Sequence, residues 1–163
     1  MRDDARPDRS RRTPDLGLLD SLVQLSFAVQ GALERVAEKH ELSLVQVRLL
    51  GILRDREPPM LELARFLTLD KSSVTGLVTR AEGRGLVQRT TRPEDRRVVH
   101  VALTDKGREL AQRFTKQAEQ ELATLVADLS ELDRTRLSTV ATKIVIGEGQ
   151  RRLPSAAIPP RKR

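Results

Sequence analysis

Three arginines stand within six residues, between two short runs of β-branched side chains. The cluster is Arg92, Arg96 and Arg97, with Glu94 and Asp95 beside them. A solvated loop rarely needs so many guanidinium groups, whereas a hairpin tip that enters the narrow minor groove of DNA does, because the electrostatic potential there is most negative. Asp95 can hold Arg97 in a bidentate pair and orient it in advance. The cluster therefore predicts a minor-groove contact.

A second group of candidate contacts lies on a helix predicted from about Lys71 to Arg84, which Asp70 can cap and Gly85 ends. Its apolar side chains recur at helical spacing and are expected to pack inward. The outward face is small and hydroxylated near the N-terminus, as insertion into a major groove requires. We interpret Gly76 as clearance for the groove, although glycine can also be merely tolerated there. The candidate DNA contacts on this helix are Lys71, Ser72, Ser73, Thr75, Gly76 and Arg80.

The arginine cluster needs a hairpin to carry it. The runs 86–90 and 98–103 predict two strands, and residues 91–97 the charged tip between them. In the second strand His100 alternates with its valine neighbours, so it is expected to face outward from the hairpin. Three short helices precede the strands, and that order predicts a winged helix-turn-helix.

Capping residues mark where the helices are expected to begin. The signals are Thr13 followed by Pro14, Ser43 with Gln46, Asp70, Thr104, and Ser130 with Asp133. The first helix, from about Leu16 to Lys39, is apolar on nearly all sides, so in a small protein it is expected to be buried by a second subunit. The last helix is expected to run to Gly147.

These elements predict a mainly α protein with a small β-hairpin wing, built as a winged helix-turn-helix plus a helical dimerisation region. The expected parts are a disordered tail at 1–12, an N-terminal dimerisation helix at 13–42, the DNA-binding region at 43–103, C-terminal dimerisation helices at 104–146 and a basic, proline-containing tail at 147–163. Residues 70–103 carry seven basic and four acidic side chains, and a basic segment in an otherwise neutral globule favours a polyanionic partner. The basic C-terminal tail either adds to that attraction or only aids solubility.

Composition excludes several classes of function. The 163 residues include no cysteine and two histidines 60 positions apart, which argues against thiol chemistry, a metal site and a catalytic dyad. Three phenylalanines are the only aromatic residues other than histidine, which argues against nucleic-acid binding by base stacking. No apolar run approaches the ~20 residues of a membrane span, and no apolar signal segment opens the chain. We expect a cytoplasmic protein that is not an enzyme, with no cofactor, metal or membrane partner.

In combination these motifs resemble the MarR family of bacterial transcriptional regulators, over about residues 16–146. The segments that carry the resemblance are Leu63-Ala64, the run from Leu69 to Thr75, Gly85-Leu86-Val87, Asp95-Arg96-Arg97, and the run from Leu103 to Gly107. The resemblance implies an obligate homodimer whose wing arginine reaches the minor groove and whose recognition helix reads a palindromic operator. Many relatives repress neighbouring genes and leave DNA when a small, often phenolic, anionic molecule binds.

The chain departs from the family pattern at three positions. Pro59 stands where members usually have a hydroxyl cap, and Thr68 where they often have glycine. Gly76 stands where they frequently have arginine, which removes a base or phosphate contact and puts the operator sequence in doubt more than DNA binding itself. Without cysteine, the thiol-based peroxide sensing of some relatives is impossible.

The resemblance places a ligand pocket where the first, second and fifth helices meet the DNA-binding part, with Phe27, His40 and Arg48 as candidates and Arg35 as a further one. Arg48 interrupts an apolar helix. It can pair with an anionic ligand, or it can pair with a nearby carboxylate or lie exposed, and we favour the second interpretation. We favour His40 as a satisfied interface histidine.

Two functions follow from the sequence. The first is a dimeric, sequence-specific transcriptional regulator that binds double-stranded DNA, a repressor released by a small anionic or aromatic effector. The alternative is a winged-helix protein-interaction module without a ligand response. Loss of operator binding on replacing Arg97 would separate them, because only the first function needs that contact.

Overall fold

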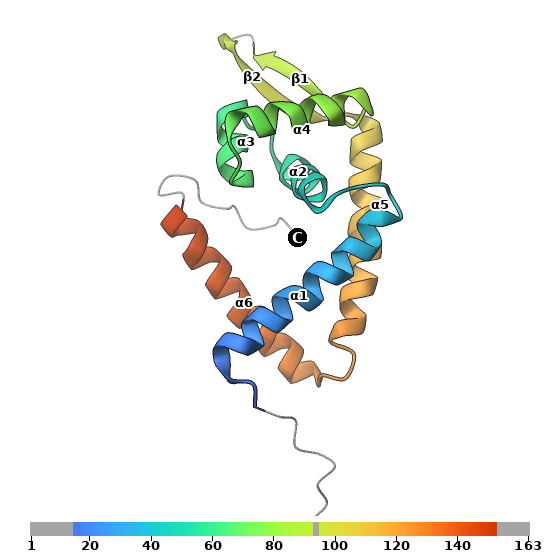
Figure 1. Cartoon of the computed structure of the whole chain (residues 1–163), viewed down its shortest axis with the longest axis vertical. Coiled ribbons are helices and arrows are strands. Elements are labelled where there is room, and N and C mark those ends of the chain that lie inside the picture. The colour runs from blue at the N-terminus through green and yellow to red at the C-terminus, as the bar shows by residue number, and fades with distance from the viewer. Residues whose placement is uncertain (1–14, 93–94, 153–163) are drawn as a thin grey trace, which may run out of the picture. The chain divides into compact units, whose positions relative to one another are not determined.

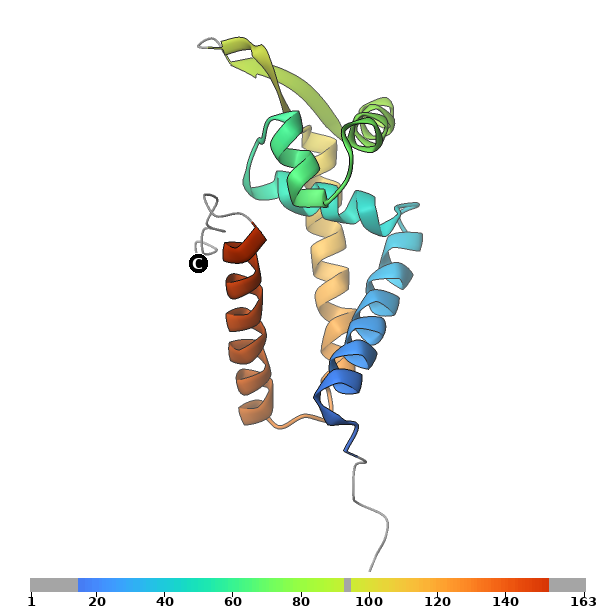
Figure 2. The same ribbon diagram turned by 60° about the vertical axis from the view of Figure 1, so that its left-hand side comes forward.

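A computed structural model describes residues 15–92 and 95–152 of the chain. The chain divides into two compact units, residues 1–121 and 122–163. Figure 1 shows the elements in chain order and Figure 2 shows them turned by 60°. The helices are α1 (Gly17–Glu38), α2 (Leu44–Asp55), α3 (Met60–Leu67), α4 (Lys71–Gly83), α5 (Asp105–Leu125) and α6 (Glu131–Arg152), and the strands are β1 (Val87–Arg92) and β2 (Asp95–Leu103). The expectation of a mainly helical winged helix-turn-helix is confirmed.

Most helices begin where the capping residues predict. The Ser43–Gln46 capping box opens α2, with the Gln46 side chain accepting from the Ser43 N–H at 2.9 Å. Thr104 caps α5 by accepting from the Gly107 N–H at 3.0 Å, and Ser130 caps α6 by accepting from the Asp133 N–H at 3.2 Å. These contacts satisfy amide groups that have no partner inside the helix.

The first helix begins with a different contact. The helix α1 begins at Gly17, whose N–H donates to the Asp15 carboxylate at 2.9 Å. The predicted entry at Thr13 and Pro14 lies outside the described residues.

The hairpin is longer than the β-branched runs indicated. The strands pair antiparallel, with Val87 opposite Leu103 and a bulge between Thr91 and Arg92, where Arg92 pairs with Asp95. The expected seven-residue tip at 91–97 is therefore wrong, because both of its flanks continue the ladder. Backbone hydrogen bonds extend the strands through polar residues that carry no hydrophobic alternation.

His100 is buried, contrary to the expectation that it faces outward. The residue is 8% exposed, and its ring Nδ1 lies 2.9 Å from the Glu57 carbonyl oxygen. The α2–α3 connection lies along β2 here, with a bridge between Pro59 and His100 and a bond from the Val101 N–H to the Pro58 carbonyl at 3.1 Å. In a strand that is covered on both faces, odd-numbered and even-numbered residues are both buried, so alternation alone does not predict which side chains are exposed.

One hydrophobic core holds the winged part together. Fully buried side chains come from α2, α3, α4 and β2, and the same cluster extends to the end of α1 and the first half of α5. Its largest members are Leu49, Leu63, Leu67, Leu77 and Leu103. The helix α4 and the base of the hairpin therefore belong to one packed core within residues 1–121.

The terminal helices carry apolar side chains that the single chain leaves exposed. On α1 these are Leu18, Leu19, Leu22, Val23, Leu25 and Phe27, and on α6 they are Leu132, Leu137, Val140, Ile144, Val145 and Ile146. The helix α6 continues to Arg152, beyond the expected end at Gly147. A glycine inside a helix costs only about 1 kcal/mol relative to alanine, so it does not by itself end one.

Candidate nucleic-acid interface

The N-terminus of α4 is organised by Asp70. Its carboxylate accepts from the Ser73 N–H at 2.8 Å, from the Ser73 hydroxyl at 2.6 Å and from the Ser72 hydroxyl at 2.5 Å. The hydrogen bonds from Ser72 and then Ser73 hold the pKa of Asp70 well below its usual range. Two of the predicted DNA contacts, Ser72 and Ser73, thus donate their hydroxyl protons to Asp70.

We expect the stabilisation by Asp70 to fade at acid pH. Because its pKa is lowered in the folded state, its contribution is complete above the ordinary aspartate pKa of about 4 and is lost as the pH falls further. Asp70→Asn keeps an oxygen that can accept from Ser73 but does not titrate. The gap in unfolding free energy between wild type and this variant should narrow as the pH falls from about 5 to 3, measured by urea unfolding. A gap that does not change with pH would contradict this assignment.

The outward face of α4 carries exposed side chains, and a hollow lies beside it. The inward residues Val74, Leu77, Val78 and Ala81 are buried as predicted, while Lys71, Ser72, Ser73, Thr75 and Arg80 are exposed. The Thr75 hydroxyl donates to the Lys71 carbonyl at 2.8 Å. A Cβ at Gly76 would lie 3.2 Å from the Arg80 Nη1, so the guanidinium of Arg80 folds back over this glycine.

A hollow of about 470 Å³ runs beside this face, and it is lined by Val45, Leu69, Ser72, Ser73, Gly76, Leu77 and Arg80. Four of the six predicted contacts on α4 line it. Gly76 borders this hollow, and the Arg80 guanidinium covers its Cβ position, so the interpretation of Gly76 as clearance for a groove stays a prediction.

The wing places its basic residues at its far end. Arg97 lies on β2 and is exposed. Arg92 and Asp95 are register partners next to the tip. The side chains of Arg92, Asp95 and Arg96 lie outside the described residues, so the predicted pair between Asp95 and Arg97 remains a prediction.

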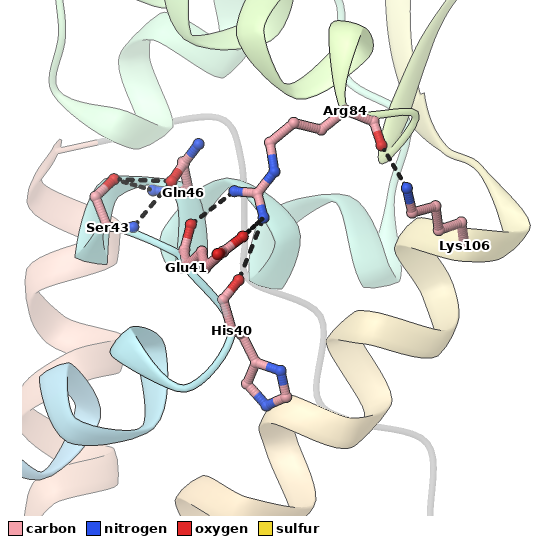
Figure 3. Close-up of polar contacts among 6 residues, drawn as sticks. All are labelled: His40, Glu41, Ser43, Gln46, Arg84 and Lys106. Carbon is pink, nitrogen blue, oxygen red and sulfur yellow. Dashed lines mark hydrogen bonds and ion pairs between the residues drawn. The ribbon is translucent and has the colours of Figure 1, made fainter.

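The opposite end of α4 is fastened by two cations (Figure 3). Arg84 Nη1 donates to the Glu41 carbonyl at 2.7 Å and Nη2 to the His40 carbonyl at 3.2 Å. Lys106 Nζ donates to the Arg84 carbonyl at 2.8 Å. These bonds cap the ends of α1 and α4, where cations suit the negative end of each helix dipole. They hold α4 between the α1–α2 turn and the start of α5.

Comparison with known proteins identifies this arrangement. A sequence model described as the MarR family matches residues 42–99, which run from the start of α2 into the wing. The uncharacterised HTH-type transcriptional regulator YhbI of Bacillus subtilis is 33% identical over 119 residues, covering 71% of this chain and 77% of the relative. The chain belongs to the MarR family.

Other members of the MarR family agree in sequence and in fold. The homoprotocatechuate degradative operon repressor of Escherichia coli is 31% identical over 103 residues, covering 61% of this chain and 68% of the relative. The crystal structure of wild-type MarR from E. coli, in its apo form, matches with a TM-score of 0.67 at 20% identity, covering 82% of this chain and 98% of that one. The chain is thus a DNA-binding transcriptional regulator of the MarR family, and the relatives named here are regulators.

In this MarR-family chain, one of the predicted ligand residues, His40, lines a hollow beside α5. His40 lines a hollow of about 440 Å³ with Arg84, Lys106 and Arg113, and neither Phe27 nor Arg48 lines it. Its Nε2 lies 2.9 Å from the Gln117 Oε1, so the ring has a structural partner.

The other three candidates stand in different surroundings. Phe27 and Arg48 are exposed on α1 and α2, and Arg35 pairs with Glu121 at 3.4 Å. In the part of the chain that the structure describes, no cluster of potential metal ligands occurs and no helix is long and apolar enough to cross a membrane.

Sequence analysis missed Arg84, Lys106 and the Arg89–Glu82 pair that joins β1 to α4. Arg84 and Lys106 bind backbone carbonyls of residues distant in sequence, and no pattern of residue types announces such bonds. A signal for Arg89 does exist. It stands next to the buried Val87–Leu103 pairing, where strand alternation can turn it toward α4.

Proposed function

We propose that this regulator is a dimeric repressor that binds a palindromic operator through α4 and the wing and is released by a small anionic or aromatic ligand. The observation that carries the proposal is that the two candidate DNA-binding elements, α4 and the wing, belong to one compact unit. The helix α4, which carries the exposed hydroxyl groups, and the strand β2, which carries Arg97, contribute their buried residues to the same core. One half-site can therefore meet α4 in its major groove and the wing in its minor groove.

The basic groups set the expected salt dependence. If each half-site makes three to five phosphate contacts, a dimer makes about six to ten, and affinity should fall about 10³- to 10⁵-fold between 50 and 200 mM salt. Two copies related by a two-fold axis would read half-sites about 10 base pairs apart. The exposed apolar side chains of α1 and α6 support a second copy as the partner, since patches of this kind mark association surfaces.

Repression and release rest on two supports. The E. coli relative is, by its name, a repressor of a homoprotocatechuate degradative operon. In this chain Arg48 interrupts the apolar sequence of α2 and is exposed, and among the described residues no carboxylate lies within ion-pair distance of it. Its guanidinium can therefore bind an anionic ligand in a bidentate manner.

Arg97→Ala is expected to weaken operator binding by about 100-fold or more, because each of two half-sites loses a minor-groove contact worth about 1–3 kcal/mol. Arg113→Ala is the matched control, since it removes the same charge from α5, where Arg113 Nη1 lies 3.7 Å from Glu109. Fluorescence anisotropy with labelled operator measures both variants. Equal affinities of the two variants would argue for the protein-interaction module.

The function itself is tested by titrating the protein against the intergenic DNA upstream of its own gene, beside a scrambled duplex. Specific binding that homoprotocatechuate or another aromatic acid reverses would support a ligand-released repressor, and Arg48→Gln should then bind DNA but resist release. Specific binding that no compound reverses would support the regulator without the ligand response. Equal, weak binding to both duplexes would count against the operator proposal.

A further inference from the structure

Arg89 joins the wing to α4 by three contacts. Its Nη1 forms an ion pair with Glu82 Oε2, and its Nη2 donates to the Thr79 hydroxyl at 2.9 Å. Its backbone N–H donates to Glu82 Oε1 at 3.4 Å. Both partner residues, Thr79 and Glu82, lie on the last two turns of α4, so one residue of β1 connects the strand to that helix.

The other strand of the wing is held differently. Pro58, Pro59 and the Glu57 carbonyl contact β2 at His100 and Val101, and most of these contacts use backbone atoms. The backbone between α4 and β1 turns at Gly85, whose φ of 69° is available at no cost to glycine. The strand β1 pairs along its length with β2, and the Leu86 N–H just before it donates to the Ala81 carbonyl of α4 at 2.9 Å. Further along β1, the Arg89 side chain adds direct contacts from the strand to α4.

A small rotation of the wing about Arg89 produces a large displacement of its tip. Arg89 pairs with Val101, three residues before Arg92 at the tip, so the lever is about 10 Å long at 3.3 Å per residue. A rotation of about 15° would move the tip by about 2.6 Å over that length. A displacement of this size is enough to break a hydrogen bond to a phosphate or a base edge.

We propose that Arg89 and Glu82 are positioning residues for DNA recognition, which set the angle between α4 and the wing so that both reach the grooves of one half-site. The proposal rests on the proposed function, because it needs α4 and the wing to touch DNA together. The guanidinium serves two partners with separate nitrogens, one on the carboxylate and one on the Thr79 hydroxyl. A lysine offers a single nitrogen and cannot keep this geometry.

A second role for Arg89 would be direct contact with a phosphate. The two roles predict opposite changes in operator affinity when Glu82 is replaced. Glu82→Gln removes a negative charge close to DNA and releases Arg89. If Arg89 were a phosphate contact held back by Glu82, this change would tighten binding. If the pair positions the wing, the same change weakens binding although the protein becomes more positive.

The experiment measures operator affinity of the full chain over a range of salt concentrations. Glu82→Gln and Arg89→Gln should each weaken binding about tenfold or more, as expected when a charge-assisted hydrogen bond is removed. The slope of log affinity against log salt should also become shallower by about 0.9 for each phosphate that the variant no longer neutralises. A variant that is only partly folded lowers the active fraction and leaves that slope unchanged, so the slope separates positioning from loss of fold.

Three further variants sharpen the result. Glu109→Gln makes the same charge change on α5 and should bind as wild type or slightly tighter. Arg89→Lys should bind as weakly as Arg89→Gln. The exchange of Glu82→Arg with Arg89→Glu in one chain restores the opposite charges and should recover part of the affinity that either single change loses.

The outcomes are distinct. Glu82→Gln that binds as tightly as Glu109→Gln, or tighter, would overturn the positioning role while the wild type still binds its operator. A wild type without specific DNA binding would overturn the proposed function and this inference with it.

Discussion

The double substitution Leu18→Glu with Leu19→Glu is expected to convert the protein to a monomer and to weaken operator binding about 10²- to 10⁴-fold. In the single chain these side chains are 78% and 74% exposed, so the carboxylates do not disturb the protomer. Against a second copy they would be buried without partners, which opposes association. A monomer then binds one half-site at a time and loses the effective concentration that links the two sites.

Leu61→Glu is the matched control for this prediction. Leu61 lies on α3 and is 63% exposed, so its substitution introduces the same carboxylate on a helix other than α1 or α6. Analytical ultracentrifugation at micromolar concentration should find the control dimeric and the double variant monomeric. A double variant that is dimeric like the control would place the association surface elsewhere. A wild-type protein that is monomeric would contradict the proposed dimer.

Local signals made the DNA-binding elements predictable. The helix α4 has a capping aspartate at its start, four inward apolar residues at helical spacing and a glycine after its end, and the structure has each in its place. The wing was predictable because the periodicity changes from helical to strand-like after α4, and two strand-like runs flank the arginines. These signals depend on neighbours within a few residues, which a sequence displays directly.

Contacts between distant segments were not predictable in the same way. Strand alternation predicted that His100 faces outward, but the α2–α3 connection, more than 40 residues earlier, covers that face and supplies the Glu57 carbonyl. The three interactions of Arg89 with α4 likewise require knowledge of the angle at Gly85. Burial and pairing of this kind are decided by how segments pack, so a single sequence leaves them open.

Gly107 shows a sequence signal whose physical reason appears only in the fold. It closes the run from Leu103 that carries the family resemblance, yet nothing in that run says why glycine is needed. A Cβ at this position would lie 1.9 Å from the Leu86 carbonyl oxygen and 2.9 Å from the Leu86 carbonyl carbon. The same oxygen accepts from the Thr104 N–H at 3.1 Å, so the start of α5 lies directly against the backbone that leads from α4 into β1.

Gly107→Ala is therefore expected to destabilise the protein by about 2–3 kcal/mol, because the clash is with backbone that cannot rotate away, and the helix propensity of alanine offsets only about 1 kcal/mol of the strain. The displaced segment at Leu86 connects α4 to the wing, so operator affinity should fall as well, even under conditions where the variant is folded. Gly51→Ala is the matched control. Gly51 lies in α2, where a Cβ would meet no atom within 4 Å beyond its chain neighbours and the backbone of its own helix. Its replacement by alanine should stabilise the protein by up to about 1 kcal/mol. Urea unfolding followed by circular dichroism measures both variants, and equal stabilities would mean that α5 and the α4–β1 connection separate at no cost.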